Sequence, residues 1–97
     1  MRIRVLRSAR KTIMTGFWFY ENQESGLGRY FIDSIMSDLR SLDVSGGIHQ
    51  IAYGRYHRMV CKTFPFSVFY RFENSEVTVH AVLDDRRDPK LISEHLN

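Results

Sequence analysis

Residues 64–85, FPFSVFYRFENSEVTVHAVLDD, place apolar side chains at every second position along two runs that a short polar break separates. Alternation of this length is typical of two antiparallel strands with one buried face, and the break ENSE predicts the hairpin turn between them. The predicted buried face consists of Phe66, Val68, Tyr70, Phe72, Val77, Val79, Ala81 and Leu83. A chain with this hairpin needs further elements to cover that face.

The first half of the chain supplies two candidates for that cover. Residues 9–20 and 27–42 carry apolar side chains at helical spacing. Gly26 and Gly28 interrupt the pattern between them, and glycine is favoured where a helix ends. Two helices joined by so short a segment predict an antiparallel hairpin. Before them, residues 2–7 alternate and predict a first strand.

Residues 57–63 also alternate, which predicts a strand with Met59 and Cys61 buried. Asp88 followed by Pro89 predicts the N-cap and first residue of a short helix. The sequence therefore predicts an α+β fold. Its expected parts are an N-terminal strand, an antiparallel helical hairpin, three antiparallel strands in one sheet with the helices on one face, and a short C-terminal helix.

Length and composition predict the number of domains and the cellular compartment of the chain. With 97 residues, we expect a single domain that spans residues 1–97. Cys61 is the one cysteine, which excludes an internal disulfide and favours the reducing cytoplasm. No apolar run approaches the roughly 20 residues that a membrane span needs. The N-terminal segment MRIRVLRSARK is basic but lacks the apolar core of a signal peptide. We therefore expect a cytoplasmic protein with no membrane association.

The sheet face opposite the predicted helices collects basic side chains. Arg58, Lys62 and Arg71 alternate along their strands, so they share this face and can bind phosphate or an acidic segment. Phe69 lies beside them, where a ring can stack on a base. The predicted target- or nucleic-acid-binding residues are Arg58, Lys62, Phe69, Arg71, Arg86 and Arg87. The alternatives are a solvated strand face and, for the last two arginines, ion pairs with the neighbouring aspartates.

Three other side chains are candidates for function. His80 is the best general acid or base, because the pKa of histidine lies near neutrality. Trp18 and Phe19 lie off the apolar stripe of their helix and suggest a protein-binding surface, unless they pack under the C-terminal segment. No pair of histidines or carboxylates has metal-ligand spacing, so we expect neither a metal nor a cofactor.

The segments FWFYENQESGLGRYF, FPFSVFY and VTVHAVLDDRRDP, in this order, resemble the RelE/ParE toxin superfamily. The resemblance extends from Ala9 to Pro89. Members are the toxins of bacterial type II toxin–antitoxin modules and are also called plasmid stabilisation proteins. The resemblance implies a strand, a helical hairpin and a curved antiparallel sheet, and a toxin that inhibits growth. It also implies a cognate antitoxin as partner, for which Trp18 and Phe19 are the predicted contacts.

Two target classes follow from the resemblance. RelE-like members cleave mRNA on the ribosome, and ParE-like members inhibit DNA gyrase. Ser67 stands where RelE-like proteins usually carry an arginine, and the segment PKLISEHLN lacks their tyrosine. A metal-independent nuclease would need His80 or Lys62 as its base and Arg71 or Arg86 to stabilise charge, so the candidate catalytic residues are Lys62, His80 and Arg86. The incomplete set favours a gyrase inhibitor. A ribosome-dependent mRNA endonuclease is the alternative, and a non-catalytic member that only binds antitoxin is the third reading.

Overall fold

The computed structural model describes residues 1–96. Its elements are β1 (Arg2–Val5), α1 (Arg7–Glu21), α2 (Leu27–Ser45), β2 (Ile51–Ala52), β3 (Tyr56–Val60), β4 (Phe66–Glu73), β5 (Glu76–Asp84) and α3 (Pro89–Leu96). The strands form one sheet in the order β1-β5-β4-β3-β2. The predicted α+β fold is confirmed, and β2 is an additional short strand. β1 joins the sheet by parallel pairing with β5, while the other neighbours are antiparallel.

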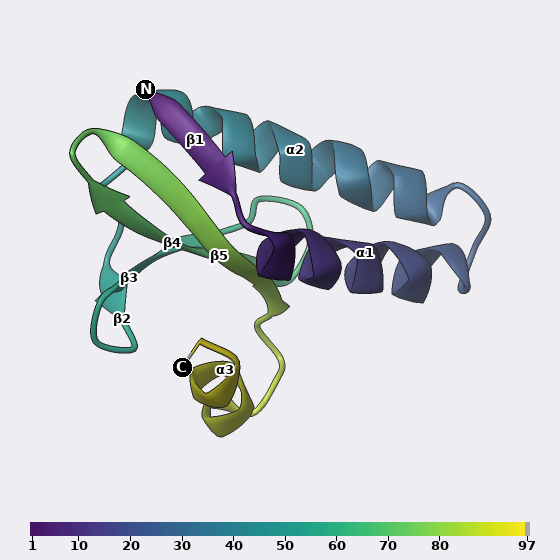
Figure 1. The fold of residues 1–97 in the computed structure, drawn as a ribbon. Coiled ribbons are helices and arrows are strands. Elements are labelled where there is room, and N and C mark those ends of the chain that lie inside the picture. The colour runs from purple at the N-terminus through teal and green to yellow at the C-terminus, as the bar shows by residue number, and fades with distance from the viewer. Residues whose placement is uncertain (97) are drawn as a thin grey trace.

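The sheet has a helix layer on each face, and the two layers differ in size (Figure 1). The antiparallel pair α1 and α2 covers one face, here called the inner face, and α3 lies against the opposite, outer face. Two glycines let α1 and α2 approach closely. A Cβ atom at Gly16 would lie 2.6 Å from the ring of Phe31, and one at Gly28 would lie 2.8 Å from the ring of Phe17. Gly16 therefore permits the packing of a helix that it weakens locally.

The main core lies between the helix pair and the inner face. Aromatic side chains from both layers form its centre: the ring centroids of Tyr20 and Phe64 are 4.7 Å apart, and those of Phe31 and Phe66 are 5.0 Å apart. Val79 of β5 is fully buried against them. Aromatic pairs at these distances contribute packing energy beyond the area that they bury. Most of the stability of the chain therefore comes from this face.

A β-bulge changes the direction of side chains halfway along β5. Tyr70 pairs with Val79, whereas Phe69 pairs with Ala81, so His80 is an extra residue opposite the two. A bulge places two residues of one strand against one position of its partner. The alternation of inner-facing and outer-facing side chains therefore inverts after His80.

This inversion corrects part of the predicted buried face. Ala81 and Leu83 were expected to face the helix pair, but they turn to the outer face, and Val82 enters the main core instead. A second apolar cluster forms there beneath α3, and its members are Tyr56, Phe69, Ala81, Leu83, Ile92 and Leu96. The expectation that Phe69 is exposed for stacking is also wrong, because α3 leaves it only 1% accessible.

Candidate functional site

Arg58 is tied into the structure rather than free on the sheet. Its Nε donates a hydrogen bond to Ser67 Oγ at 2.9 Å, and its Nη2 donates to Asp85 Oδ1 at 2.8 Å. Ser67 Oγ in turn donates to Asp85 Oδ1 at 2.6 Å, and Ser67 is fully buried. Charge-assisted hydrogen bonds of this kind fix geometry. The network joins β3, β4 and the segment after β5, and it neutralises the charge of Arg58.

Arg86 and Arg87 have different surroundings. Arg86 forms a fork with Asp84, in which Nε donates to Oδ1 at 2.9 Å and Nη2 donates to Oδ2 at 2.6 Å. These hydrogen bonds lower the pKa of Asp84 and raise that of Arg86. Among residues 1–96, no carboxylate forms an ion pair with Arg87. The ion-pair alternative therefore holds for Arg86, which pairs with Asp84. Arg87 stays a candidate for binding a target.

The three predicted catalytic residues are not assembled into one site. Lys62 follows the end of β3, and Arg86 follows the end of β5. His80 lies four residues before Asp84, the last residue of β5, which corresponds to roughly 13 Å at about 3.3 Å per residue. General acid–base catalysis needs groups within hydrogen-bond reach of the same reacting atoms. This arrangement does not provide that geometry.

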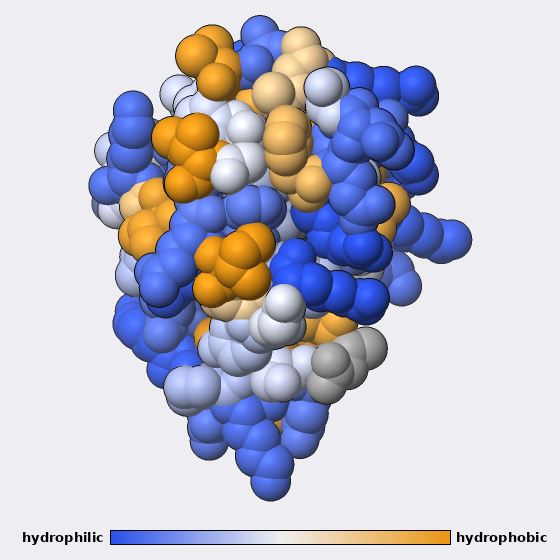
Figure 2. Space-filling view, turned by 90° about the vertical axis from the view of Figure 1, so that its left-hand side faces the viewer, coloured by the Kyte–Doolittle hydropathy of each residue, from blue (hydrophilic) through white to orange (hydrophobic). Residues whose placement is uncertain are grey.

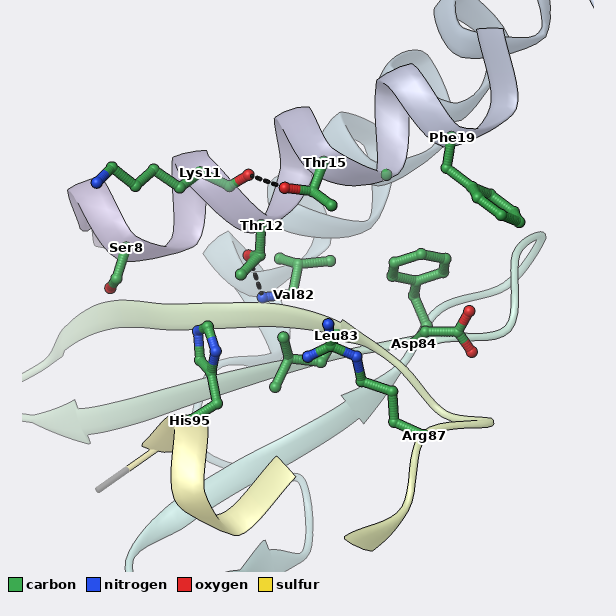
Figure 3. A pocket seen from close by; sticks show the side chains of 12 residues that line it. Ser8, Lys11, Thr12, Thr15, Phe19, Val82, Leu83, Asp84, Arg87 and His95 are labelled. Carbon is green, nitrogen blue, oxygen red and sulfur yellow. Dashed lines mark hydrogen bonds between the residues drawn. The ribbon is translucent and has the colours of Figure 1, made fainter. Parts of the chain in front are cut away.

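A groove of about 390 Å³ lies between α1, the end of β5 and α3 (Figure 3). Its lining residues are Ser8, Lys11, Thr12, Thr15, Gly16, Phe19, Phe66, Val82, Leu83, Asp84, Arg87 and His95. Apolar atoms dominate this lining, so we call it the apolar groove. Ser8 and Phe19 lie at its opposite ends, and Lys11 and Arg87 supply positive charge. The groove combines an apolar floor with cationic and hydroxyl groups, as ligand sites commonly do.

Hydroxyl groups of α1 hold the wall of the apolar groove against β5. β1 pairs only with Glu76–Val79, so the second half of β5 has no strand beside it on that edge. Ser8 Oγ donates to the carbonyl of His80 at 2.9 Å. Thr12 Oγ1 accepts from the N–H of Val82 at 3.0 Å (Figure 3). These bonds satisfy edge groups that would otherwise lack a partner. The groove is therefore built on two fixed elements.

Trp18 and Phe19 are exposed, as predicted, but they occupy different surfaces. The accessible fraction is 56% for Trp18 and 51% for Phe19. Phe19 lines the apolar groove. Trp18 does not line it, and its ring meets Phe17 edge-on with 4.8 Å between centroids. Their predicted role in partner binding stays a prediction, with Phe19 better placed for an occupant of the groove.

A second hollow, of about 440 Å³, lies at the other end of β5 on the outer face. Its lining residues are Arg4, Leu6, Arg71, Glu73, Asn74, Glu76, Thr78 and His80, and we call it the basic basin. The predicted turn closes one end, with positive φ of 52° at Asn74 and 59° at Ser75, as a tight two-residue hairpin requires. Of the predicted site residues, the basin brings together only Arg71 and His80.

The basic basin also contains one cation, Arg4, that was not among the site residues predicted from the sequence. Burial lowers the pKa of His80, and the charges of Arg71 and Arg55 lower it further. Arg4 reaches the basin from β1. The alternation RIRV indicates which face of its strand Arg4 occupies. Placing Arg4 beside Arg71 also requires the parallel pairing of β1 with β5, which the sequence does not reveal. The long-range pairing therefore determines which cations are neighbours.

Residues 1–96 offer neither a metal-binding cluster nor an activated thiol. No cluster of three or more histidine, cysteine, aspartate or glutamate side chains could ligate a metal there. Burial, together with the nearby Asp38, raises the pKa of the Cys61 thiol, which makes it a poor nucleophile. In the same part of the chain, no helix has both the length and the apolar character of a membrane span.

Neither a protein-family model nor a curated protein matches this chain. Among solved structures, it is similar to a chain described as "Chromosomal ParDE TA system from P. aeruginosa", with a TM-score of 0.63 and 16% sequence identity. The similarity covers 84% of this chain and 92% of the other. At this identity it shows a shared fold, and the shared architecture is the one that the sequence resemblance implied.

Proposed function

We propose that this chain is the toxin of a type II toxin–antitoxin module. The fold that it shares with a chain of a ParDE system and the order of its sequence motifs both support this function. The observation that carries the proposal is the apolar groove with exposed Phe19 beside it. An apolar surface of this kind on a small protein is typical of a site that a partner covers.

The chemistry of the apolar groove suggests the antitoxin segment that fits it. An apolar side chain would rest on Gly16 and Val82, and a neighbouring carboxylate would reach Lys11 or Arg87. An acidic, amphipathic segment that orders on binding meets both requirements. Trp18 would contact the same partner where it continues over α1.

For the target, the site favours a gyrase-directed toxin over an mRNA nuclease. His80 lies four residues along β5 from its last residue, Asp84, and so is separated from Arg86, and the charges of Arg58 and Arg86 are already paired. A toxin that inhibits gyrase by binding needs no catalytic group and no cofactor. Arg71 is likewise paired, with Glu73, so the cations that this proposal leaves for target contacts are Lys62 and Arg87.

Induction of the protein alone in a bacterial host tests this function. We expect growth arrest with loss of negative supercoiling in a reporter plasmid, while total mRNA stays intact. Cleavage of mRNA before any change in supercoiling would support the nuclease instead. Growth that matches an empty vector would contradict the assignment as a toxin.

The antitoxin site is tested by co-expression with the product of the neighbouring short reading frame. We expect a stable complex and restored growth. Phe19→Ser should weaken that complex by about 2 kcal/mol, as expected for an aromatic anchor in a groove. Trp18→Ser is the comparison variant: it removes an equally exposed ring that meets the partner only outside the groove, so it should weaken the complex less than Phe19→Ser does. An equal loss in both variants would place the antitoxin on the exterior of α1 rather than in the apolar groove.

A further inference from the structure

We propose that the basic basin binds the phosphate groups of a nucleic-acid backbone. This inference goes beyond the proposed function, because neutralisation by an antitoxin and binding to gyrase require no contact with nucleic acid. It also concerns a part of the sheet separate from the apolar groove, since the two hollows share no lining residue.

The sheet register aligns three phosphate-binding side chains in one row. Thr78 of β5 is the register partner of Arg4 in β1 and of Arg71 in β4. Neighbouring strands lie about 4.8 Å apart, so the two arginines start about 10 Å apart with the threonine between them. Arginine side chains are long enough to converge over that distance. Two guanidinium groups and a hydroxyl can therefore contact one phosphate or two successive ones.

Positive charge exceeds negative charge around the basic basin. The arginines are Arg2, Arg4, Arg55 and Arg71, and the carboxylates are Glu73 and Glu76. The two glutamates are themselves register partners across the turn, which is an unfavourable pairing of like charges. The arginines relieve this repulsion through ion pairs, with 3.5 Å between Arg4 and Glu76. Exposed pairs of this kind are weak, so a phosphate can compete for the guanidinium groups.

The lining favours a nucleic-acid backbone over an acidic protein. Leu6 is the single apolar residue among those that line the basin, whereas protein partners need an apolar anchor. The end of the molecule that carries the β4–β5 turn is mainly hydrophilic, with hydrophobic residues in separate patches (Figure 2). Guanidinium, hydroxyl and amide donors are the groups that contact phosphate oxygens in such complexes. No aromatic ring except the imidazole of His80 lines the basin, so we expect binding that does not depend on base sequence.

Fluorescence anisotropy with labelled duplex DNA and with single-stranded RNA of equal length tests the proposal. We expect wild-type protein to bind, and Arg4→Gln combined with Arg71→Gln to bind about 10-fold or more weakly. Its slope of log K against log salt on duplex DNA should fall by about 1.8, for two lost phosphate contacts. The matched control, Arg29→Gln with Arg40→Gln, removes the same charge from exposed positions on α2 and should change affinity less than about twofold.

Several outcomes would overturn the proposal. They are absence of binding by the wild type, unchanged binding by the basin variant, and an equal loss in the α2 control. Competition at matched ionic strength separates the ligand sources: inorganic phosphate or a polyglutamate peptide that competes as well as unlabelled oligonucleotide contradicts a backbone site. Thr78→Val keeps every charge and the shape of the side chain, so it serves if the double variant fails to fold. We expect it to weaken binding about threefold, and unchanged binding would count against the row.

Discussion

The two faces of the sheet differ in how much of each is covered by helices and in the side chains that they carry. The inner face is covered by α1 and α2, of 15 and 19 residues, and it holds the main core. The outer face is covered only at one end, by the eight-residue α3, and the basic basin occupies the other end. Because the inner face stabilises the fold, the outer face is free to carry polar and charged groups that contribute little to stability.

The largest expected effect comes from a charge on the inner face. Val79 is fully buried in the main core, so Val79→Asp places an unpaired carboxylate there. We expect a loss of more than about 4 kcal/mol and an unfolded chain by circular dichroism. Thr78→Asp is the control, because the adjacent side chain points into the basic basin, and it should stay folded. A cooperative thermal transition in Val79→Asp would reverse the assignment of the faces.

A smaller effect should follow from a cavity under α3. Ile92 is 5% accessible in the outer cluster, and Ile92→Ala should cost about 2 kcal/mol, at the lower end for a buried isoleucine because α3 is short. Hydrogen exchange should speed up in α3 but not in α1 or α2, since segments with few contacts open independently. Equal acceleration in all three helices would mean that the two faces unfold as one unit.

Asp88, at the start of α3, is expected to contribute to stability and not to toxicity. Asp88 Oδ1 accepts a hydrogen bond from the N–H of Lys90 at 2.9 Å, which confirms the predicted N-cap. Asp88→Ala should therefore cost about 1 kcal/mol in a denaturant titration. It should leave growth inhibition at the wild-type level under conditions where the variant is folded.

The double variant Arg86→Ala with Arg87→Ala should behave in the opposite way. Both side chains are exposed, so we expect an unchanged melting temperature together with weaker growth inhibition. The comparison needs growth curves beside thermal melts for both variants. Full toxicity in a folded double-arginine variant would show that this motif is only an exit from the sheet.

The smallest expected effect is a change of thermal stability with pH, caused by one histidine on each face of the sheet. On the inner face, Tyr70 Oη accepts from the N–H of Gly47 at 3.0 Å, so its own proton is available for Nδ1 of His49 at 2.5 Å. Nδ1 can accept this proton only when His49 is neutral, and the pKa of His49 is lowered by burial and then by the charge of His57. On the outer face, burial and two arginines lower the pKa of His80.

For both histidines the folded state binds fewer protons than the unfolded state. Their contribution to stability is therefore complete above the ordinary pKa of 6.5 and declines as the pH falls below it. We expect a lower melting temperature at pH 5.5 than at pH 7.5. His49→Gln should reduce this difference more than His80→Gln, because neutral His49 can accept a hydrogen bond from Tyr70, whereas the side chain of His80 forms no hydrogen bond within residues 1–96. Equal melting temperatures at both pH values in the wild type would contradict this account.

The order of helices and strands could be predicted from the sequence because periodicity is a local property. The bulge could not be predicted from the sequence, because the alternation before His80 is regular and no nearby residue indicates an extra position. The position of α3 over Phe69 could not be predicted either, because it depends on a tertiary contact that leaves no local pattern in the sequence. The site was predicted only in part for a related reason: Arg4 meets Arg71 through strands from opposite ends of the chain.

The parallel pairing of β1 with β5 has a consequence for synthesis in the cell. The first strand cannot find its partner until the last strand has left the ribosome, and at about 5–20 residues per second a chain of this length takes roughly 5 to 20 s to make. Contacts between such distant segments also slow folding after release. During that interval the row from Arg4 to Arg71 does not exist. A nascent chain therefore cannot use the basic basin, whatever ligand is present, before β5 has emerged from the ribosome.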